Sequence, residues 1–207
     1  IAGLGGTLRP FQEAGVEYAR RTQRCFLADE MGLGKTVESL AVLQAEHLFP
    51  ALVVCPASVK LNWVKEAVTW LPGKRITWMD GGAEQFEVKP GGRAPVRCLS
   101  NQVTAADVVI LNYDLLKKWQ EVLIARPWKA LVIDESHYAK NPKAQRTQYV
   151  KTLALGDVKT NRPGIPWRLL LTGTPILNRP VELIAQLQIL GHLQALGGWS
   201  WFTKRYC

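Results

Sequence analysis

The chain has 207 residues, 47% of them hydrophobic, so it can bury the core of one large α/β domain or of two small ones. No apolar run reaches the roughly 18 residues that a membrane-spanning helix requires, and the N-terminus lacks the basic segment of a secretory signal. With 26 Lys and Arg against 17 Asp and Glu residues, the net charge is +9, which favours a polyanionic partner.

The cysteines and histidines show no metal-binding pattern. None of the four cysteines forms a Cys-x-x-Cys pair, and the three histidines are not spaced to complete a zinc site. Cys25 and Cys55 lie in or beside apolar runs and are expected in the core. A reducing compartment fits this usage, so we expect a protein that is not secreted and is cytoplasmic, or nuclear in a eukaryote.

Short apolar runs recur along the chain, and each is continuous rather than alternating. Such runs are typical of strands buried on both faces of a parallel sheet. They lie at residues 25–28, 51–55, 108–111, 130–133 and 169–171. Helical patterns fall between them at residues 37–48, 59–70 and 180–190. Strands that alternate with helices predict an α/β sandwich with a mostly parallel central sheet.

The segment at residues 59–70 carries a clear helical stripe. Val59, Trp63, Ala67 and Trp70 recur at the spacing of one helix face. We therefore assign both tryptophans to the core rather than to stacking on bases. Ser58 precedes the stripe and is a candidate N-cap.

Two stretches interrupt this rhythm. Residues 73–102 contain Gly-Gly and Pro-Gly-Gly among charged residues, which predicts a surface insertion with room for a small β-hairpin. Residues 157–166 form a second loop. Because the strand pattern resumes after each stretch, we expect residues 1–207 to form a single domain.

A glycine-rich loop follows the first apolar run and opens a helical pattern, the context that a phosphate-binding loop needs. Residues 29–36 read Asp-Glu-Met-Gly-Leu-Gly-Lys-Thr. Glycines let the backbone approach phosphate oxygens, and the helix N-terminus then faces the anion. We expect Lys35 to bind the β- and γ-phosphates and Thr36 to ligate Mg²⁺. The general pattern has Gly or Ala where this chain has Asp29, so a plain glycine turn is the alternative.

Two acids end the apolar run at residues 130–133. Asp134 and Glu135 would lie at the carboxyl edge of the sheet, where ligands bind in open α/β folds. We expect Asp134 to hold Mg²⁺, directly or through water, and Glu135 to orient and deprotonate the attacking water. A strand that simply ends in solvated acids is the alternative.

Taken together, residues 29–36 and the Asp-Glu-Ser-His of residues 134–137 resemble the Snf2-type ATPases of helicase superfamily 2. This resemblance covers about residues 8–207, and the family carries Asp at the position of Asp29. It implies a RecA-like three-layer sandwich that binds ATP and Mg²⁺. Gln12 would read adenine. The nucleotide site would then consist of Gln12, Met31, Gly32, Leu33, Gly34, Lys35 and Thr36.

Further segments resemble the family's other motifs, at residues 54–58, 62–63, 109–113, 140–142 and 171–175. His137, Thr172 and Thr174 would couple the acidic box to bound DNA. Side-chain hydroxyls, amides and lysines can position a duplex without reading its sequence. The residues expected to contact the DNA backbone are Ser58, Asn62, Tyr113, Lys140 and Asn141. For each of these residues, a cap, a turn or a solvated side chain is the alternative.

The resemblance also implies what this chain does. We expect the first, ATP-binding lobe of a DNA-dependent ATPase that translocates on or remodels double-stranded DNA. The family needs a second RecA-like lobe, whose motifs do not follow here, so we expect weak hydrolysis by this lobe alone. Residues 178–183 and 205–207 resemble the annealing-helicase branch more weakly. The alternatives are a strand-separating DNA or RNA helicase, a catalytically retired nucleotide- or DNA-binding module, and an unrelated P-loop kinase or GTPase.

Overall fold

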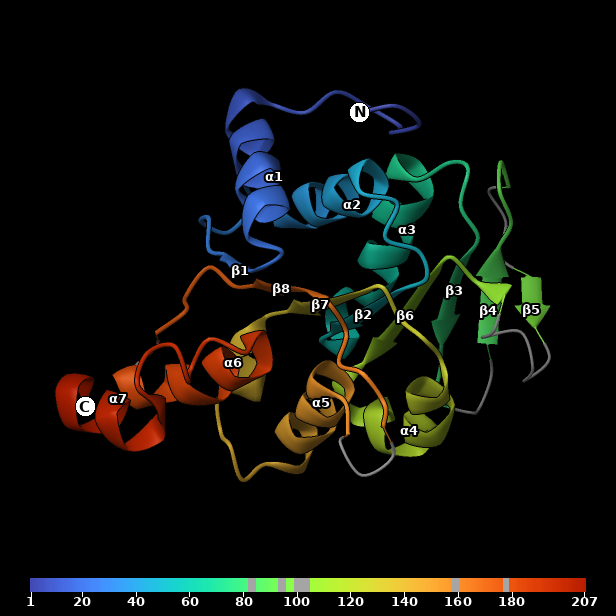
Figure 1. Cartoon of the computed structure of the whole chain (residues 1–207). Helices are drawn as coiled ribbons and strands as arrows, with labels where there is room; N and C mark the ends of the chain where they lie inside the picture. The colour runs from blue at the N-terminus through green and yellow to red at the C-terminus, as the bar shows by residue number, and fades with distance from the viewer. Residues whose placement is uncertain (82–84, 93–95, 99–104, 158–160, 177–178) are drawn as a thin grey trace.

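A twisted β-sheet forms the centre of the computed structural model (Figure 1). The structure describes residues 1–207 apart from 82–84, 93–95, 99–104, 158–160 and 177–178. Eight strands are present in the described residues. In spatial order they are β1 (Arg24–Leu27), β8 (Trp167–Leu171), β7 (Ala130–Asp134), β2 (Ala51–Cys55), β6 (Val108–Asn112), β3 (Ile76–Met79), β4 (Gln85–Val88) and β5 (Val96–Cys98).

In spatial order, neighbouring strands from β1 through β3 all pair in parallel, whereas β4 pairs antiparallel with both β3 and β5 at one edge. The central strands are buried on both faces. In β2, Ala51, Val53 and Cys55 join one hydrophobic cluster, whereas Leu52 and Val54 join the other. This alternation explains why the strand reads as one continuous apolar run, and it confirms the predicted mostly parallel sheet.

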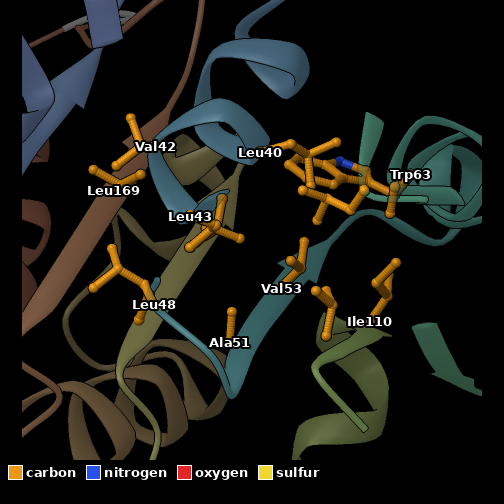
Figure 2. Packing of buried hydrophobic residues seen from close by; sticks show 14 of the residues in the cluster. Leu40, Val42, Leu43, Leu48, Ala51, Val53, Trp63, Ile110 and Leu169 are labelled. Atoms are coloured by element: carbon orange, nitrogen blue, oxygen red, sulfur yellow. The ribbon is translucent and has the colours of Figure 1, made fainter. Parts of the chain in front are cut away.

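Helices cover both faces of the sheet (Figure 1). On one face lie α1 (Pro10–Thr22), α2 (Lys35–Ala45) and α3 (Lys60–Trp70); on the other lie α4 (Leu116–Ala125), α5 (Gln145–Leu155) and α6 (Leu183–Leu190). The last helix, α7 (Gly198–Tyr206), packs through Phe202 against Ile184 and Leu187 of α6. Figure 2 shows Leu40 and Leu43 of α2 above Val53 of β2, in the core between the helices and the sheet.

The helices expected after the glycine loop, at residues 59–70 and before Gly191 are confirmed, whereas α1, α4, α5 and α7 were not predicted. Ser58 is not the N-cap of α3, because it lies inside a 3₁₀ turn at Ala57–Val59 and makes no capping hydrogen bond. Trp63 is buried in the core as expected, and Trp70 packs against the same cluster from its edge. Cys25 and Cys55 are buried free thiols, also as expected.

The segment at residues 73–102 is only partly a surface insertion. Its first strand, β3, is fully part of the central sheet, because it pairs in parallel with β6 and all four of its residues are buried. The antiparallel strands β4 and β5 then extend the sheet edge, which agrees with the expected hairpin. The surface prediction was wrong for β3 because its alternating Ile-Thr-Trp-Met sequence is less apolar than the other central strands.

A buried arginine fixes helix α6 against the sheet. Arg168 of β8 donates hydrogen bonds to the carbonyls of Ile165, Ile189 and Leu190, so it satisfies backbone groups at the C-terminal end of α6. Burial, together with the charge of Arg24, lowers the pKa of Arg168 to about 10. This anchor matters for the site, because α6 also contacts the acidic end of β7.

No helix in the described residues has both the length and the apolar character needed to cross a membrane.

Candidate nucleotide and nucleic-acid site

The glycine loop joins the end of β1 to the start of α2. Gly32 and Gly34 have positive φ angles of 85° and 90°, a backbone conformation that side chains with a Cβ rarely adopt. At Gly34 a Cβ would also lie 2.5 Å from Nε2 of Gln12, so a larger residue would have to displace that side chain. At Gly32 a Cβ would meet no atom within 4 Å, so the loop is open on that side. The two glycines therefore have different roles, close packing at Gly34 and an open backbone surface at Gly32.

The loop and the acidic box line one pocket, although about a hundred residues separate them in the sequence. β7 and β1 are separated only by β8, and the three strands are parallel, so their carboxyl ends meet at one edge of the sheet. A cavity of about 370 Å³ opens there. It is lined by Met31, Gly32, Gly34, Lys35, Thr36, Val37, Asn62, Glu66, Asp134 and Glu135.

Five of the seven predicted nucleotide residues line this pocket, and Gln12 and Leu33 are not among its lining residues. The Lys35 ammonium group donates to the carbonyls of Asp29, at 2.6 Å, and Glu30, at 2.9 Å. Met31 is 68% exposed, and Leu33 is exposed as well. Gln12 is buried, and its amide donates to the carbonyl of Leu33 and accepts from the backbone of Arg9. The Gln12 side chain thus ties α1 to the glycine loop, and its contact with adenine stays a prediction.

The carboxylate of Asp134 is held at both oxygens. Oδ1 accepts the backbone N–H of Glu135 at 3.0 Å, and Oδ2 accepts the indole N–H of Trp63 at 2.7 Å. Burial raises the pKa of Asp134, whereas the hydrogen bond from Trp63 and then the bond from Glu135 act to lower it. The Trp63 contact was not predicted, because the helical stripe that marks Trp63 as a core residue does not reveal where its N–H points.

Glu135 adopts a strained backbone conformation at the start of the 3₁₀ turn Ser136–Ala139. Its φ of 47° and ψ of 55° lie in the left-handed region, which costs free energy for a residue with a side chain. The Oε2 atom of Glu135 is buried and accepts no hydrogen bond from the described residues, although Nδ1 of His137 lies 3.2 Å from it. Glu135 therefore lines the pocket, while its Oε2 atom lies against His137.

The predicted coupling residues lie together. Nδ1 of His137 is 3.4 Å from Oγ1 of Thr172, and that hydroxyl oxygen accepts the backbone N–H of Thr174 at 3.1 Å. A second connection was not predicted: the buried hydroxyl of Ser136 donates to Gln186 of α6 at 2.6 Å, and the Gln186 amide donates to the carbonyl of Pro175. The acidic box thus contacts the Thr-Gly-Thr-Pro loop both directly and through α6.

The five residues expected to contact DNA follow β2, β6 and β7, which are neighbours in the sheet. Ser58 and Asn141 are exposed at this edge, and Lys140 forms a 3.0 Å ion pair with Glu182. Asn62 lines the phosphate pocket. Tyr113 is only 4% exposed and donates its hydroxyl to the carbonyl of Asp134 at 2.7 Å, and its contact with DNA stays a prediction.

Comparison with known proteins places this arrangement in a family. The sequence profile of the SNF2-related domain matches residues 11–207. This chain belongs to the SNF2-related domain family. In a solved structure of the Sulfolobus solfataricus SWI2/SNF2 ATPase core in complex with dsDNA, the similar region is 28% identical and superposes with a TM-score of 0.77. It covers 98% of this chain and 39% of that one. The RecA-like sandwich expected from the sequence is therefore confirmed.

Individual relatives support the same family membership. The human DNA annealing helicase and endonuclease ZRANB3 is 35% identical over 99% of this chain, and the helicase SWR1 of Gibberella zeae is 36% identical over 97% of it. The two identities are nearly equal, so they support the SNF2-related family rather than one branch of it. The chain spans only 18% of the ZRANB3 sequence and 12% of the SWR1 sequence.

A buried carboxyl group lies beside the pocket of this SNF2-related domain and yields a test. Glu38 of α2 is 0% exposed, so its carboxyl group is removed from water. Across from it, a Cβ on Gly15 of α1 would lie 2.9 Å from Oε2. Burial and the negative charge of Asp29 raise the pKa of Glu38 to about 7, although Lys35 opposes the shift.

We expect Glu38 to make the stability of this domain depend on pH. The folded pKa of about 7 lies above the ordinary value of 4.5, so the folded state binds the proton more tightly. Glu38 therefore contributes up to about 3 kcal/mol to the free energy of unfolding. This contribution is fully present below pH 4.5 and is lost as pH rises through about 7. Glu38→Gln should remove this decline, as measured by urea unfolding at several pH values. Glu121→Gln, at an exposed position of α4, is the control; if the Glu38→Gln and wild-type curves decline in parallel, the assignment is wrong.

Proposed function

We propose that this domain is the ATP-binding lobe of a DNA-dependent ATPase that translocates on or remodels double-stranded DNA. One observation carries the proposal: Lys35 and Thr36 of the glycine loop line the same pocket as Asp134 and Glu135 of the acidic box. This pocket combines a cation for phosphate, oxygen ligands for a metal ion and a carboxylate beside both. Family membership supports the same activity.

The pocket residues fit ATP with Mg²⁺. The open backbone at Gly32 and the Lys35 ammonium group suit the phosphates, and the Thr36 hydroxyl and Asp134 carboxylate supply oxygen ligands of the kind that Mg²⁺ prefers. When bound, Mg²⁺ would neutralise negative charge on the phosphates. Glu135 would accept a proton from the attacking water, since it lines the same pocket as Thr36 and Asp134.

A second RecA-like lobe completes the site in this proposal. The relatives are much longer than this chain, which covers 39% of the Sulfolobus core structure. In P-loop ATPases an arginine supplied to the γ-phosphate is typically worth about 10³–10⁵ in rate. If that arginine comes from a second lobe, this lobe alone holds nucleotide but hydrolyses it slowly.

The charge of the chain supports a DNA partner, as does its similarity to the ATPase core that was solved in complex with dsDNA. The chain carries a net charge of +9. A groove near the carboxyl edge of the sheet is lined by Tyr113, Asp114, Lys117, Ala144, Gln145, Arg146 and Tyr149. Lys117 and Arg146 are exposed, and the Arg146 guanidinium lies 5.9 Å from the ring centre of Tyr138. We assign both cations to contacts with the DNA backbone.

Duplex binding by this chain tests the DNA assignment. The variant with Lys117→Ala and Arg146→Ala should bind a fluorescent DNA duplex more weakly. Its plot of log affinity against log salt concentration should be shallower by about 2, because each phosphate contact contributes roughly 0.9 to the slope. A matched variant with Arg21→Ala and Lys65→Ala removes the same charge from α1 and α3. Equal slopes for the two variants would refute the assignment, and tighter binding to RNA than to duplex DNA would refute the proposed partner.

A further inference from the structure

Trp63 connects helix α3 to the acidic end of strand β7. Its indole N–H donates a 2.7 Å hydrogen bond to Oδ2 of Asp134, which lies 71 residues later in the chain. The side chain is only 1% exposed, and its ring belongs to the hydrophobic cluster that includes Leu40 (Figure 2). The residue therefore combines a core position with a polar contact to the site.

The hydrogen bond limits how the Asp134 carboxylate can turn. The backbone N–H of Glu135 holds Oδ1 at 3.0 Å, and the indole holds Oδ2, so the two donors fix both ends of the group. A carboxylate oxygen can accept two hydrogen bonds, so each oxygen keeps capacity for a cation. Since Asp134 is largely buried, the indole also offsets part of the free energy that burying a charge costs.

Two faces of helix α3 contribute to the site. Asn62 and Glu66 line the cavity together with Thr36, whereas Trp63 points into the core and reaches Asp134 from behind. The surface of α3 and its buried face therefore contact the same site. Rigid support of this kind keeps a metal ligand in place before the ion arrives.

We propose that Trp63 is a positioning residue whose indole N–H holds the Asp134 carboxylate in the orientation that binds the magnesium ion of the nucleotide. This inference rests on the proposed function, in which Asp134 is a magnesium ligand. A purely structural role would require only the ring of Trp63, whereas positioning requires its N–H. The two roles therefore separate in a variant that keeps an aromatic ring but lacks the donor.

Trp63→Phe should raise the Mg²⁺ concentration needed for half-maximal binding of a fluorescent ATP analogue to this chain by about 10- to 100-fold, the usual effect of losing support for a metal ligand. Binding of the analogue in the presence of EDTA should not change. Trp128→Phe is the matched control, because it removes another buried indole N–H, which donates to the carbonyl of Leu123 at 2.6 Å. If Trp63→Phe does not fold by circular dichroism, site-specific benzothienylalanine keeps the bicyclic shape and removes the donor.

The contact itself has a spectroscopic signature. In the nitrogen-15 spectrum of this chain, Asp134→Asn should move the indole N–H signal of Trp63, because a charged acceptor is replaced by a neutral one, and should leave the signal of Trp128 in place. An unchanged Mg²⁺ requirement in the folded Trp63 variant, with a normal Mg²⁺ response in the wild type, overturns this inference alone. If Mg²⁺ does not strengthen nucleotide binding by the wild type, the proposed function fails as well.

Discussion

Lys35→Ala is expected to weaken the binding of an ATP analogue to this chain by about 10- to 10²-fold, because it removes a charged donor to the phosphates worth roughly 1.5–3 kcal/mol. The ammonium group lies within the loop, 2.6 Å from the carbonyl of Asp29, and Lys35 lines the pocket beside Gly32 and Thr36. Fluorescence titration at saturating Mg²⁺ measures the change.

The matched control is Lys65→Ala, which removes the same charge from an exposed position of α3. Circular dichroism and thermal unfolding should confirm that both variants fold, since Lys35 also satisfies loop carbonyls. Equal affinities of the wild type and Lys35→Ala would refute the phosphate role and reduce the loop to an ordinary glycine turn.

Glu135→Gln is expected to reduce ATP hydrolysis by about 10²–10⁴-fold in a protein that joins this chain to its second lobe, because the variant loses the general base. Nucleotide binding should persist, since the amide has nearly the same shape and lies in the same pocket. The effect therefore falls on turnover and not on affinity, which distinguishes Glu135 from Lys35.

Two measurements check this separation. A steady-state assay gives the rate of phosphate release, and a titration with the fluorescent analogue gives the affinity, with Glu121→Gln as the control in both. Hydrolysis near the wild-type rate would exclude Glu135 as the base. A parallel loss of affinity would instead indicate that Glu135 holds the nucleotide or its metal ion.

Five strands of the sheet, β1, β2, β6, β7 and β8, were predictable from continuous apolar runs, whereas the buried strand β3 was not. Short, continuous apolar runs such as Ala51–Cys55 are typical of strands buried on both faces, and observed and predicted bounds agree. The helices α4 and α5 were missed. In α5, Thr147, Val150, Leu153 and Ala154 are buried among polar neighbours, so no strong apolar stripe marks the helix.

Part of the chemistry of the site could also be predicted from the sequence. The spacing of glycines before Lys35 and the paired acids at the end of an apolar strand are local signals, and parallel strands necessarily bring their carboxyl ends to one edge. The hydrogen-bond partners of the side chains around the site could not be predicted. Nothing in the sequence shows that Trp63 reaches Asp134, that Gln186 bonds Ser136 or that the Tyr113 hydroxyl faces inward, because these contacts depend on how helices pack across the sheet.

The most direct test of the proposed function is ATP hydrolysis by the two-lobe protein with duplex DNA, single-stranded DNA or RNA added, alongside this chain alone. We expect duplex DNA to stimulate turnover most, Lys35→Ala to abolish it, and this chain alone to hydrolyse ATP at least about 10³-fold more slowly. Preferential stimulation by RNA, or full DNA-stimulated turnover by these 207 residues alone, would contradict the proposal.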